Sequence, residues 1–420
     1  MDKCTHNIGG KSKIDLDISS LDAPCLFNRE IYNNFLRKTL NIKVEYDSYQ
    51  KTFPNICTPL AGIIDYYKKK NILFNFVDLG DQNGYGAKTR FWDPYIVEKT
   101  SSDEISYPFD KVWKFSTPEG VQRIMNSFVE KIRCSEIVEP GILQGITWCI
   151  NETLDNVLQH ANTDSGFVMG QIHKDSHRVV VAIFDSGRGI LKSFRDSNYC
   201  PLPKSPKDAI TLALQENVTR DKAVGQGNGM WGLAQLVQNN GGALRISSGG
   251  AGLIFDTTGH HDMALKQCLS LGEEHGTTLV DFQLNYKEKI DVDEVLGNPM
   301  IDVWLDNHEN PSGTTQYSIA EDCEGTGTRL AAERLRNIII NGYKENKTNI
   351  EIDFSGINFV SSSFSDELLG KLVASFGIVN FLRIFTLSNV SNQIETTINR
   401  SIEQRLAQKY YDPSIPDPND

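Results

Sequence analysis

The stretch 143–161, LQGITWCINETLDNVLQHA, is the sequence feature that most constrains the fold. When it is wound at about 100° per residue, its apolar side chains fall on one stripe of a helix. These side chains are Leu143, Ile146, Ile150, Leu154, Val157, Leu158 and Ala161. Glu152, Asn156 and His160 recur every four residues on the opposite side, so they stack in one polar row. The pattern predicts an amphipathic helix whose polar row is either an ordinary solvated surface or part of a site.

Three motifs that follow the helix in order favour the site. Asp185-Ser-Gly-Arg-Gly189 comes directly after an apolar strand pattern, and the glycine-rich segment 225–233 opens a second predicted helix. Gly276-Thr277-Thr278 then begins another strand. Glycine lets a ligand approach the backbone, and the amides at the start of a helix bind phosphate. The glycine-rich segment therefore permits backbone amides to face a phosphate group.

This ordered set resembles the ATP-binding domain of the GHKL superfamily, which includes gyrase, heat-shock chaperones, histidine kinases and MutL. The Glu-x3-Asn-x3-His row is most similar to that of the anti-sigma-factor serine kinases. The resemblance covers about residues 136–285. It implies a Bergerat-type two-layer α/β sandwich that binds ATP with Mg²⁺.

The resemblance also implies roles for individual residues. Asn156 would supply an amide oxygen to Mg²⁺, Asp185 would accept the adenine amino proton, and Thr277 would support Asp185. The other residues expected at the nucleotide are Gly187, Gly189, Gly225, Gly227, Gly229, Gly232 and Leu233. Glu152, one turn before Asn156, can remove a proton from water or from a serine hydroxyl, so it favours ATP hydrolysis or serine phosphorylation.

Other polar residues allow two readings each. Lys192, Arg220 and Lys222 lie in or beside a long connection that is the ATP lid in the family, and they are either γ-phosphate contacts or solvated charges. His160 either orients the surroundings of Glu152 or packs as an ordinary helix histidine. The metal-ligating residue types at 258–275 (His260, His261, Asp262, Cys268 and His275) follow no zinc spacing. We interpret that segment as an exposed insertion.

Composition narrows the class of protein. With 42 Lys and Arg against 54 Asp and Glu, the net charge of −12 argues against nucleic acid as the main ligand. The eight cysteines include no C-x-x-C pair, which fits reduced thiols and neither a disulfide framework nor a structural zinc site. No apolar run approaches 18 residues, and the N-terminus lacks the apolar core of a signal peptide. We expect a soluble cytoplasmic protein that does not bind membranes.

Alternation of strand and helix patterns predicts an α/β fold throughout. The expected organisation is a loose segment 1–25, a small α/β region 26–115, the ATP-binding domain 116–285, a linker 286–325, a STAS-like domain 326–408 and a disordered tail 409–420. Within the small α/β region we expect a loop at 80–88. In the C-terminal domain we expect a strand at 381–387 and a last helix that ends near residue 407.

The segment 352–370, IDFSGINFVSSSFSDELLG, resembles the STAS and STAS-like domains of anti-sigma-factor antagonists, in which a turn between a strand and a helix carries a phosphorylated serine. Ser362 takes the place of that serine. Ser361 replaces the family aspartate and Phe364 the family glycine. The alternative is that Ser361 to Ser363 only cap the following helix.

Together these features predict an ATP-dependent, kinase-like regulatory protein that controls a protein partner, or a second copy of itself, through the STAS-like domain. Two other classes stay open: a gyrase- or MutL-like ATPase switch that drives dimerisation, and an interaction module that holds nucleotide without turnover. Glu152 favours turnover over binding alone. The STAS-like domain and the acidic charge favour signalling over DNA mechanics.

Overall fold

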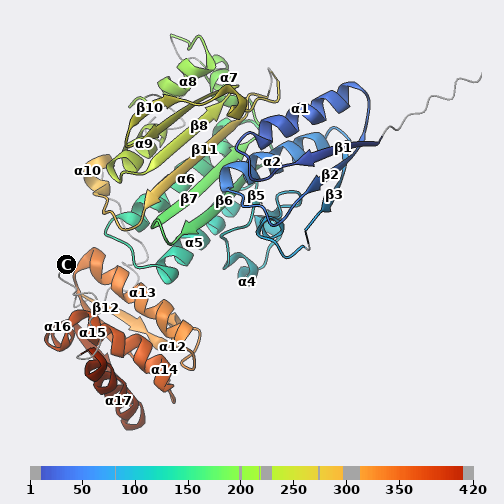
Figure 1. Ribbon diagram of the computed structural model, residues 1–420. Helices are drawn as coiled ribbons and strands as arrows, with labels where there is room; N and C mark the ends of the chain where they lie inside the picture. The colour runs from blue at the N-terminus through green and yellow to red at the C-terminus, as the bar shows by residue number, and fades with distance from the viewer. Residues whose placement is uncertain are drawn as a thin grey trace, which may run out of the picture. The chain divides into compact units, whose positions relative to one another are not determined.

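The computed structural model describes residues 11–80, 82–197, 201–216, 218, 229–272, 275–296 and 313–409 (Figure 1). The fold is α/β, and the chain divides into two compact units. One unit consists of Met1–Val129 and Gly145–Gly297, and the other of Glu130–Gln144 and Asn298–Asp420. The division falls within two helices, α5 (Pro118–Ser135) and α6 (Ile142–His160). Among the described residues, no helix combines the length and the apolar character needed to cross a bilayer.

The first unit begins with a three-stranded parallel sheet of order β1-β2-β3. Its elements are β1 (Lys11–Leu16), α1 (Ala23–Leu36), β2 (Asn41–Tyr46), α2 (Pro54–Lys68) and β3 (Leu73–Asp78). Parallel neighbours need a crossover connection, which α1 and α2 provide. The prediction of a loose segment over residues 1–25 is wrong from residue 11 onward, because β1 pairs with β2 along its whole length.

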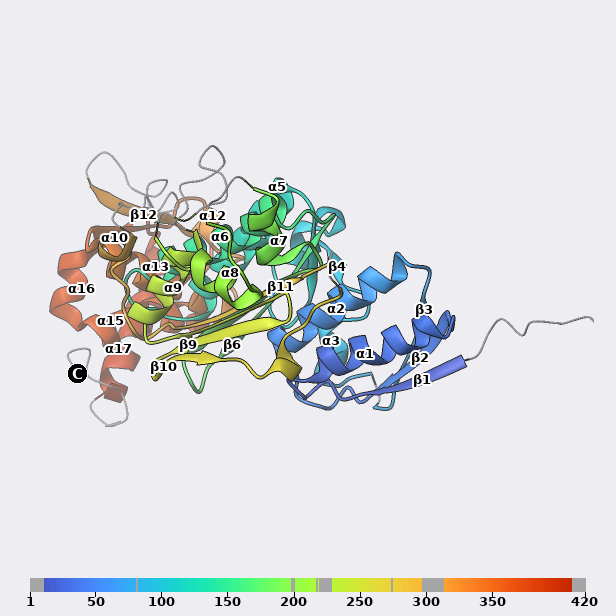
Figure 2. The ribbon, with the colours of Figure 1, turned by 90° about the horizontal axis from the view of Figure 1, so that it is seen from above.

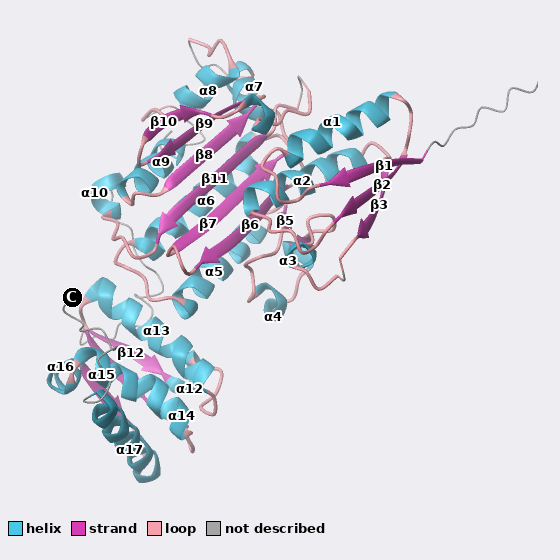
Figure 3. Cartoon of the chain, viewed as in Figure 1, coloured by secondary structure: helices cyan, strands magenta, loops and turns pink. Residues whose placement is uncertain are grey.

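The larger sheet of the first unit has eight strands in the order β10-β9-β8-β11-β7-β6-β5-β4 (Figure 3). Their bounds are β4 (Tyr95–Ile96), β5 (Trp113–Phe115), β6 (Gly166–His173), β7 (Arg178–Asp185), β8 (Ala243–Ser248), β9 (Ala251–Asp256), β10 (Gly259–Asp262) and β11 (Thr278–Asn285). Every neighbouring pair except β4 and β5 is antiparallel. The register sets Thr278 of β11 opposite Asp185 at the end of β7.

Alternation along β6 assigns different helices to the two faces of this sheet. Phe167 and Met169 belong to the same buried cluster as the apolar residues of α2. The two glycines that flank this pair face other helices, because a methyl group on Gly166 would lie 2.8 Å from Val157 of α6, and one on Gly170 2.6 Å from Phe128 of α5. The sheet is therefore covered by α2 on one face and by α5 and α6 on the other, an arrangement that can be followed in Figure 2.

Shorter elements complete the first unit. They are α3 (Tyr85–Thr89), η1 (Val97–Lys99), α4 (Ser102–Ile105), α7 (Gly189–Arg195), α8 (Pro206–Ala213), α9 (Gly229–Asn239), η2 (Leu265–Gln267) and α10 (Val292–Leu296). The segment 80–88, predicted as a loop, enters α3 at Tyr85.

The second unit contains a parallel sheet of order β12-β13-β14 with helices between the strands. Its elements are β12 (Thr314–Ser318), α12 (Ile319–Asp322), α13 (Arg329–Asn346), β13 (Asn349–Asp353), α14 (Ser362–Ser365), the π-helical η3 (Asp366–Gly370), α15 (Lys371–Phe376), α16 (Ile378–Ile384), β14 (Phe385–Ser388) and α17 (Asn392–Lys409).

Three predicted boundaries need correction. The segment 286–325 is not only a linker, because it contains α10 and β12. The strand expected from Phe381 starts at Phe385, since Phe381 and Ile384 are buried residues of α16. The last helix continues to Lys409.

Candidate functional site

Glu152 and Asn156 lie one turn apart on α6, and the start of α9 lies directly against them. A methyl group on Gly229, the first residue of α9, would come 2.6 Å from Glu152 Oε2 and 3.7 Å from Asn156 Nδ2. The structure thus brings Gly229 against two residues that precede it by more than seventy positions in the sequence. The missing side chain at Gly229 leaves room for the carboxylate and the amide.

The electrostatics of this pair suit proton transfer and ligand binding. Burial, with the negative charge of Asp155 as a second cause, raises the pKa of Glu152. A carboxylate with a raised pKa is a stronger proton acceptor. The Asn156 amide nitrogen is buried and has no hydrogen-bond partner among the described residues. Because an unsatisfied buried amide is costly, this position is suited to a polar ligand.

Asp185 ends β7 with its side chain inside the protein. Its exposed fraction is 4%, and its Oδ1 accepts a hydrogen bond of 2.8 Å from the Gly187 amide. Burial raises the pKa of Asp185 to about 7, against opposing hydrogen bonds from the Gly187 amide and the Thr278 side chain. The carboxyl is therefore held in a fixed orientation at the end of the strand.

The glycines of this turn bring it close to the end of α6. A methyl group on Gly187 would lie 2.1 Å from the Ala161 carbonyl oxygen, and the Arg188 amide donates to that same oxygen over 2.9 Å. Gly189 has a φ of +73°, which favours glycine. A side chain at this position would also be crowded, because its Cβ would lie 3.0 Å from the Gly276 backbone.

The two threonines after Gly276 have different partners. The Thr277 hydroxyl donates to the Leu269 carbonyl over 2.9 Å, and its backbone amide donates to the Gly187 carbonyl over 3.2 Å. It is Thr278 whose side chain hydrogen-bonds to Asp185. The family motif pointed to the first threonine, and only the register of β11 against β7 distinguishes the two.

The remaining motif residues of α9 serve packing. A methyl group on Gly232 would lie 2.4 Å from the Trp148 ring of α6, and Leu233 is buried with an exposed fraction of 1%. The absence of a side chain at Gly232 therefore lets α9 lie close to Trp148 of α6. The predicted lid and phosphate residues that fall outside the described residues are Arg220, Lys222, Gly225 and Gly227.

Two basic residues near the turn are engaged with an aspartate. Arg188 pairs with Asp196 at 3.1 Å and donates from Nε to the His160 carbonyl over 2.8 Å. The Lys192 ammonium lies 3.7 Å from the Asp196 carboxylate. The backbone carbonyl of His160 therefore helps to connect α6 to the Asp185 turn.

The segment 258–275, predicted as an exposed insertion, is exposed only in part. His260 and His261 are exposed on the edge strand β10, but Leu269 is buried in the cluster formed with α1 and α2. The His275 ring meets the Tyr66 ring of α2 edge to face at 4.9 Å, and its Nδ1 lies 3.3 Å from the Ser186 carbonyl. The segment thus links α2 to the Asp185 turn. Within the described residues no group of three or more His, Cys, Asp or Glu side chains could hold a metal ion.

Sequence reasoning missed a polar cluster where α2 meets the sheet. Asp281 of β11, 1% exposed, accepts from Asn55 Nδ2 over 2.9 Å and lies 3.6 Å from Arg245 of β8. Burial raises the pKa of Asp281 to about 6. These groups line a cavity of about 20 Å³, which is room for about one water molecule. The signal available in the sequence was a charged residue inside an apolar strand.

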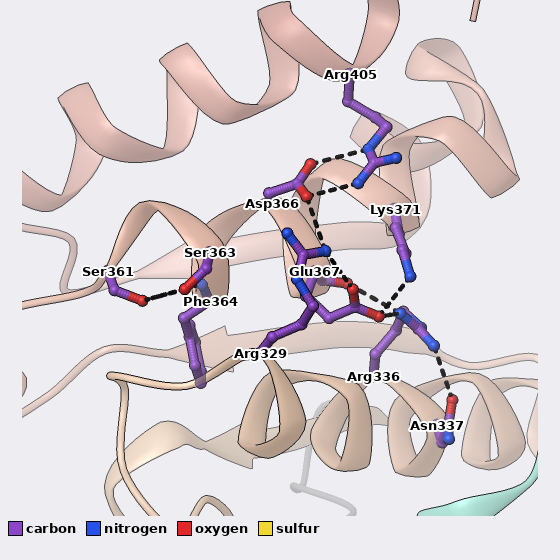
Figure 4. Close-up of polar contacts among 10 residues, drawn as sticks. All are labelled: Arg329, Arg336, Asn337, Ser361, Ser363, Phe364, Asp366, Glu367, Lys371 and Arg405. Atoms are coloured by element: carbon purple, nitrogen blue, oxygen red, sulfur yellow. Dashed lines mark hydrogen bonds and ion pairs between the residues drawn. The ribbon is translucent and has the colours of Figure 1, made fainter. Parts of the chain in front are cut away.

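The second unit places the predicted serines 361–363 at the start of α14, where Figure 4 shows Ser361 and Ser363. Ser361 Oγ accepts from the Phe364 amide over 3.1 Å and lies 3.1 Å from Ser363 Oγ. Capping by Ser361 is therefore confirmed. Ser362, the first residue of α14, is exposed.

Four basic side chains surround two carboxylates in η3, just after this turn (Figure 4). Glu367, 1% exposed, binds Arg336, Lys371 at 2.7 Å and Arg329 at 2.8 Å. Burial alone would raise the pKa of Glu367, but Lys371 and Arg336 together lower it. Its neighbour Asp366 binds Arg405 at 2.6 Å and Arg329 at 3.2 Å.

Comparison with known proteins identifies this C-terminal part of the chain. A family model described as a STAS-like domain of unknown function, DUF4325, matches residues 331–395. No curated protein matches the chain. The matched range includes α14, η3 and most of α13, and with them Ser362 and Glu367. Residues 331–395 are thus a STAS-like domain of the DUF4325 family.

Proposed function

We propose that this chain is an ATP-binding regulatory protein of the histidine-kinase-like GHKL superfamily. Its nucleotide site would lie between α6, the Asp185 turn and the start of α9. The observation that carries the proposal is the position of Gly229 beside both Glu152 and Asn156. The resemblance implies that these same residues meet around a nucleotide, and their proximity requires two separate sequence motifs to converge.

The residues present suit ATP and Mg²⁺. The antiparallel run β9-β8-β11-β7-β6, with α6 on one face, is compatible with the sandwich that the resemblance implies. Asp185 offers a buried, oriented acceptor for the adenine amino group, with Thr278 in support. Asn156 would be the Mg²⁺ ligand, since this ion keeps several waters and takes few protein ligands.

Bound ATP would supply a γ-phosphoryl group for transfer. Glu152 would accept the proton of the attacking hydroxyl, from either water or a serine side chain, and its raised pKa favours that role. The outcome is Mg-ATP-dependent hydrolysis or serine phosphotransfer, which would control a protein partner or a second copy through the STAS-like domain. The exposed position of Ser362 at a helix start suits a phospho-acceptor, because negative charge is favourable there.

Replacement of the proposed base tests this function. Glu152→Gln should retain ATP binding and lose turnover by about 100- to 10,000-fold, because the amide keeps the shape but cannot take a proton. Phosphate release and nucleotide titration on the same sample measure both properties. The exposed Glu119 of α5 provides the control, and Glu119→Gln should match wild type. Turnover in Glu152→Gln within a few-fold of wild type would refute the base assignment.

A further inference from the structure

Side chains of α13, in the STAS-like domain, hydrogen-bond to the segment that connects α5 to α6. Both partners of each hydrogen bond belong to the second unit. Asn341, 1% exposed, donates from Nδ2 to the carbonyls of Arg133 at 3.0 Å and Glu136 at 2.9 Å. Its Oδ1 accepts from the Val138 amide at 3.0 Å. One side chain thus caps the end of α5 and fixes the chain that follows it.

Two neighbouring side chains of α13 make further hydrogen bonds, one to the end of α5 and one just before the start of α6. Asn337 Nδ2 donates to the Cys134 carbonyl at 3.0 Å, in the last turn of α5. Glu345 Oε1 accepts from the Gly141 amide at 2.9 Å, one residue before α6 begins. A carboxylate at a helix start is favourable because of the helix dipole. Helix α13 therefore caps the end of one helix and the beginning of the next.

The capped start of α6 and the proposed site belong to one continuous helix. Residues 142–144 of α6 lie in the second unit, and the same helix continues to Glu152 and Asn156 in the first. A displacement at Gly141 would be carried along the helix to this pair, because the backbone hydrogen bonds keep the rise per residue constant.

Helix α13 also contacts η3, which directly follows the turn formed by residues 361–363, the serine turn. Arg336 binds Glu367 and donates from its second terminal nitrogen to Asn337 Oδ1 at 3.3 Å (Figure 4). Since Asn337 also binds the Cys134 carbonyl, polar contacts run without a break from η3 to the end of α5. Glu367 follows the proposed phospho-acceptor Ser362 by five residues, so this chain of contacts begins in the helical turn after it.

We propose that Asn337, Asn341 and Glu345 are positioning residues through which the STAS-like domain regulates Glu152 and Asn156. This proposal rests on the proposed function. A change at the serine turn, such as phosphorylation or partner binding, would alter the hydrogen bonds between α13 and the segment that leads into α6. Because coupling between two sites is reciprocal, nucleotide binding must in turn tighten or loosen the α13 contacts.

Hydrogen exchange on the full chain, with and without a non-hydrolysable ATP analogue and Mg²⁺, tests the coupling. Exchange of the Val138 and Gly141 amides should change by about fivefold or more at saturation. In Asn341→Ala that response should disappear while the analogue still binds. Asn346, exposed in the last turn of α13, supplies the matched control, so Asn346→Ala should respond as wild type does.

The outcomes separate this proposal from the proposed function. Unchanged exchange at Val138 and Gly141 in protein that binds the analogue would overturn the coupling, whereas wild type that fails to bind would overturn the nucleotide site. If Asn341→Ala does not fold, Glu345 gives a second comparison. Glu345→Gln retains an acceptor oxygen and should keep the Gly141 response, and Glu345→Ala should lose it. Equal responses in these two variants would also overturn the coupling.

Discussion

At the scale of single residues, burial determines how individual carboxyl groups respond to pH. Burial raises the pKa of Asp281 to about 6 in the folded protein, above the ordinary value of about 4 in an unfolded chain. The folded protein therefore binds the proton more tightly, so this stabilisation is complete below about pH 4 and is lost as the pH rises to about 6.

We therefore predict that Asp281→Asn flattens the pH dependence of stability between about pH 4 and pH 6, because the amide does not titrate. Urea unfolding at several pH values measures the slope for wild type and variant. Identical slopes in the two proteins would show that Asp281 ionises as freely in the folded state as in the unfolded chain.

Ser362 carries the other prediction at this scale. Incubation with Mg-ATP should add about 80 Da to the intact protein, the mass of one phosphate, and the species should be absent from both Ser362→Ala and Glu152→Gln. Ser361 caps the helix, so replacement of Ser362 leaves the cap intact. ATP consumption without any change in mass would leave hydrolysis as the reaction.

At the scale of elements, two glycines of α9 have different roles on the same helix. Gly229→Ala places a methyl group against the flexible end of Glu152, whereas Gly232→Ala places one against the Trp148 ring. The first substitution should change stability by no more than about 1 kcal/mol but reduce turnover, because the carboxylate must move. The second should cost about 1–3 kcal/mol through overpacking.

Denaturant unfolding and phosphate release on both variants separate these effects. Gly232→Ala should lose more stability than Gly229→Ala, and Gly229→Ala should lose turnover although it remains folded. Full turnover in Gly229→Ala would mean that the contact with Glu152 has no part in the reaction.

The sequence predicted elements well where the signal was local. The apolar stripe placed α6 at 143–161 against 142–160 in the structure, and the cap before Phe364 was among the readings of the serine run. The segment from Phe381 was mistaken for a strand because a short apolar run has no period that distinguishes strand from helix.

Partners distant in sequence could not be predicted from local patterns. Register decides whether Thr277 or Thr278 faces Asp185, and register depends on how two strands pair. The Asn341 contacts join residues more than two hundred positions apart. In the sequence, Asn341 is only a polar residue within a helix, and nothing beside it indicates its partners.

At the scale of the whole molecule, the chain combines a STAS-like domain with a unit in which Gly229 lies beside Glu152 and Asn156 and Asp185 ends β7. Helices α5 and α6 are shared between the two units, so the proposed site and the STAS-like domain are joined by continuous backbone. This arrangement suits a protein in which nucleotide state and partner binding influence each other.

Calorimetric titration of Mg-ATP into wild type and Asp185→Asn tests the central claim, that this unit binds adenine nucleotide, most directly. The titration belongs at about pH 8, where Asp185, with its pKa near 7, is ionised. Wild type should bind, and Asp185→Asn should bind about 10- to 100-fold more weakly, since a hydrogen bond to a charged acceptor is lost. Equal affinity in a folded Asp185→Asn, or no binding by wild type, would contradict the account.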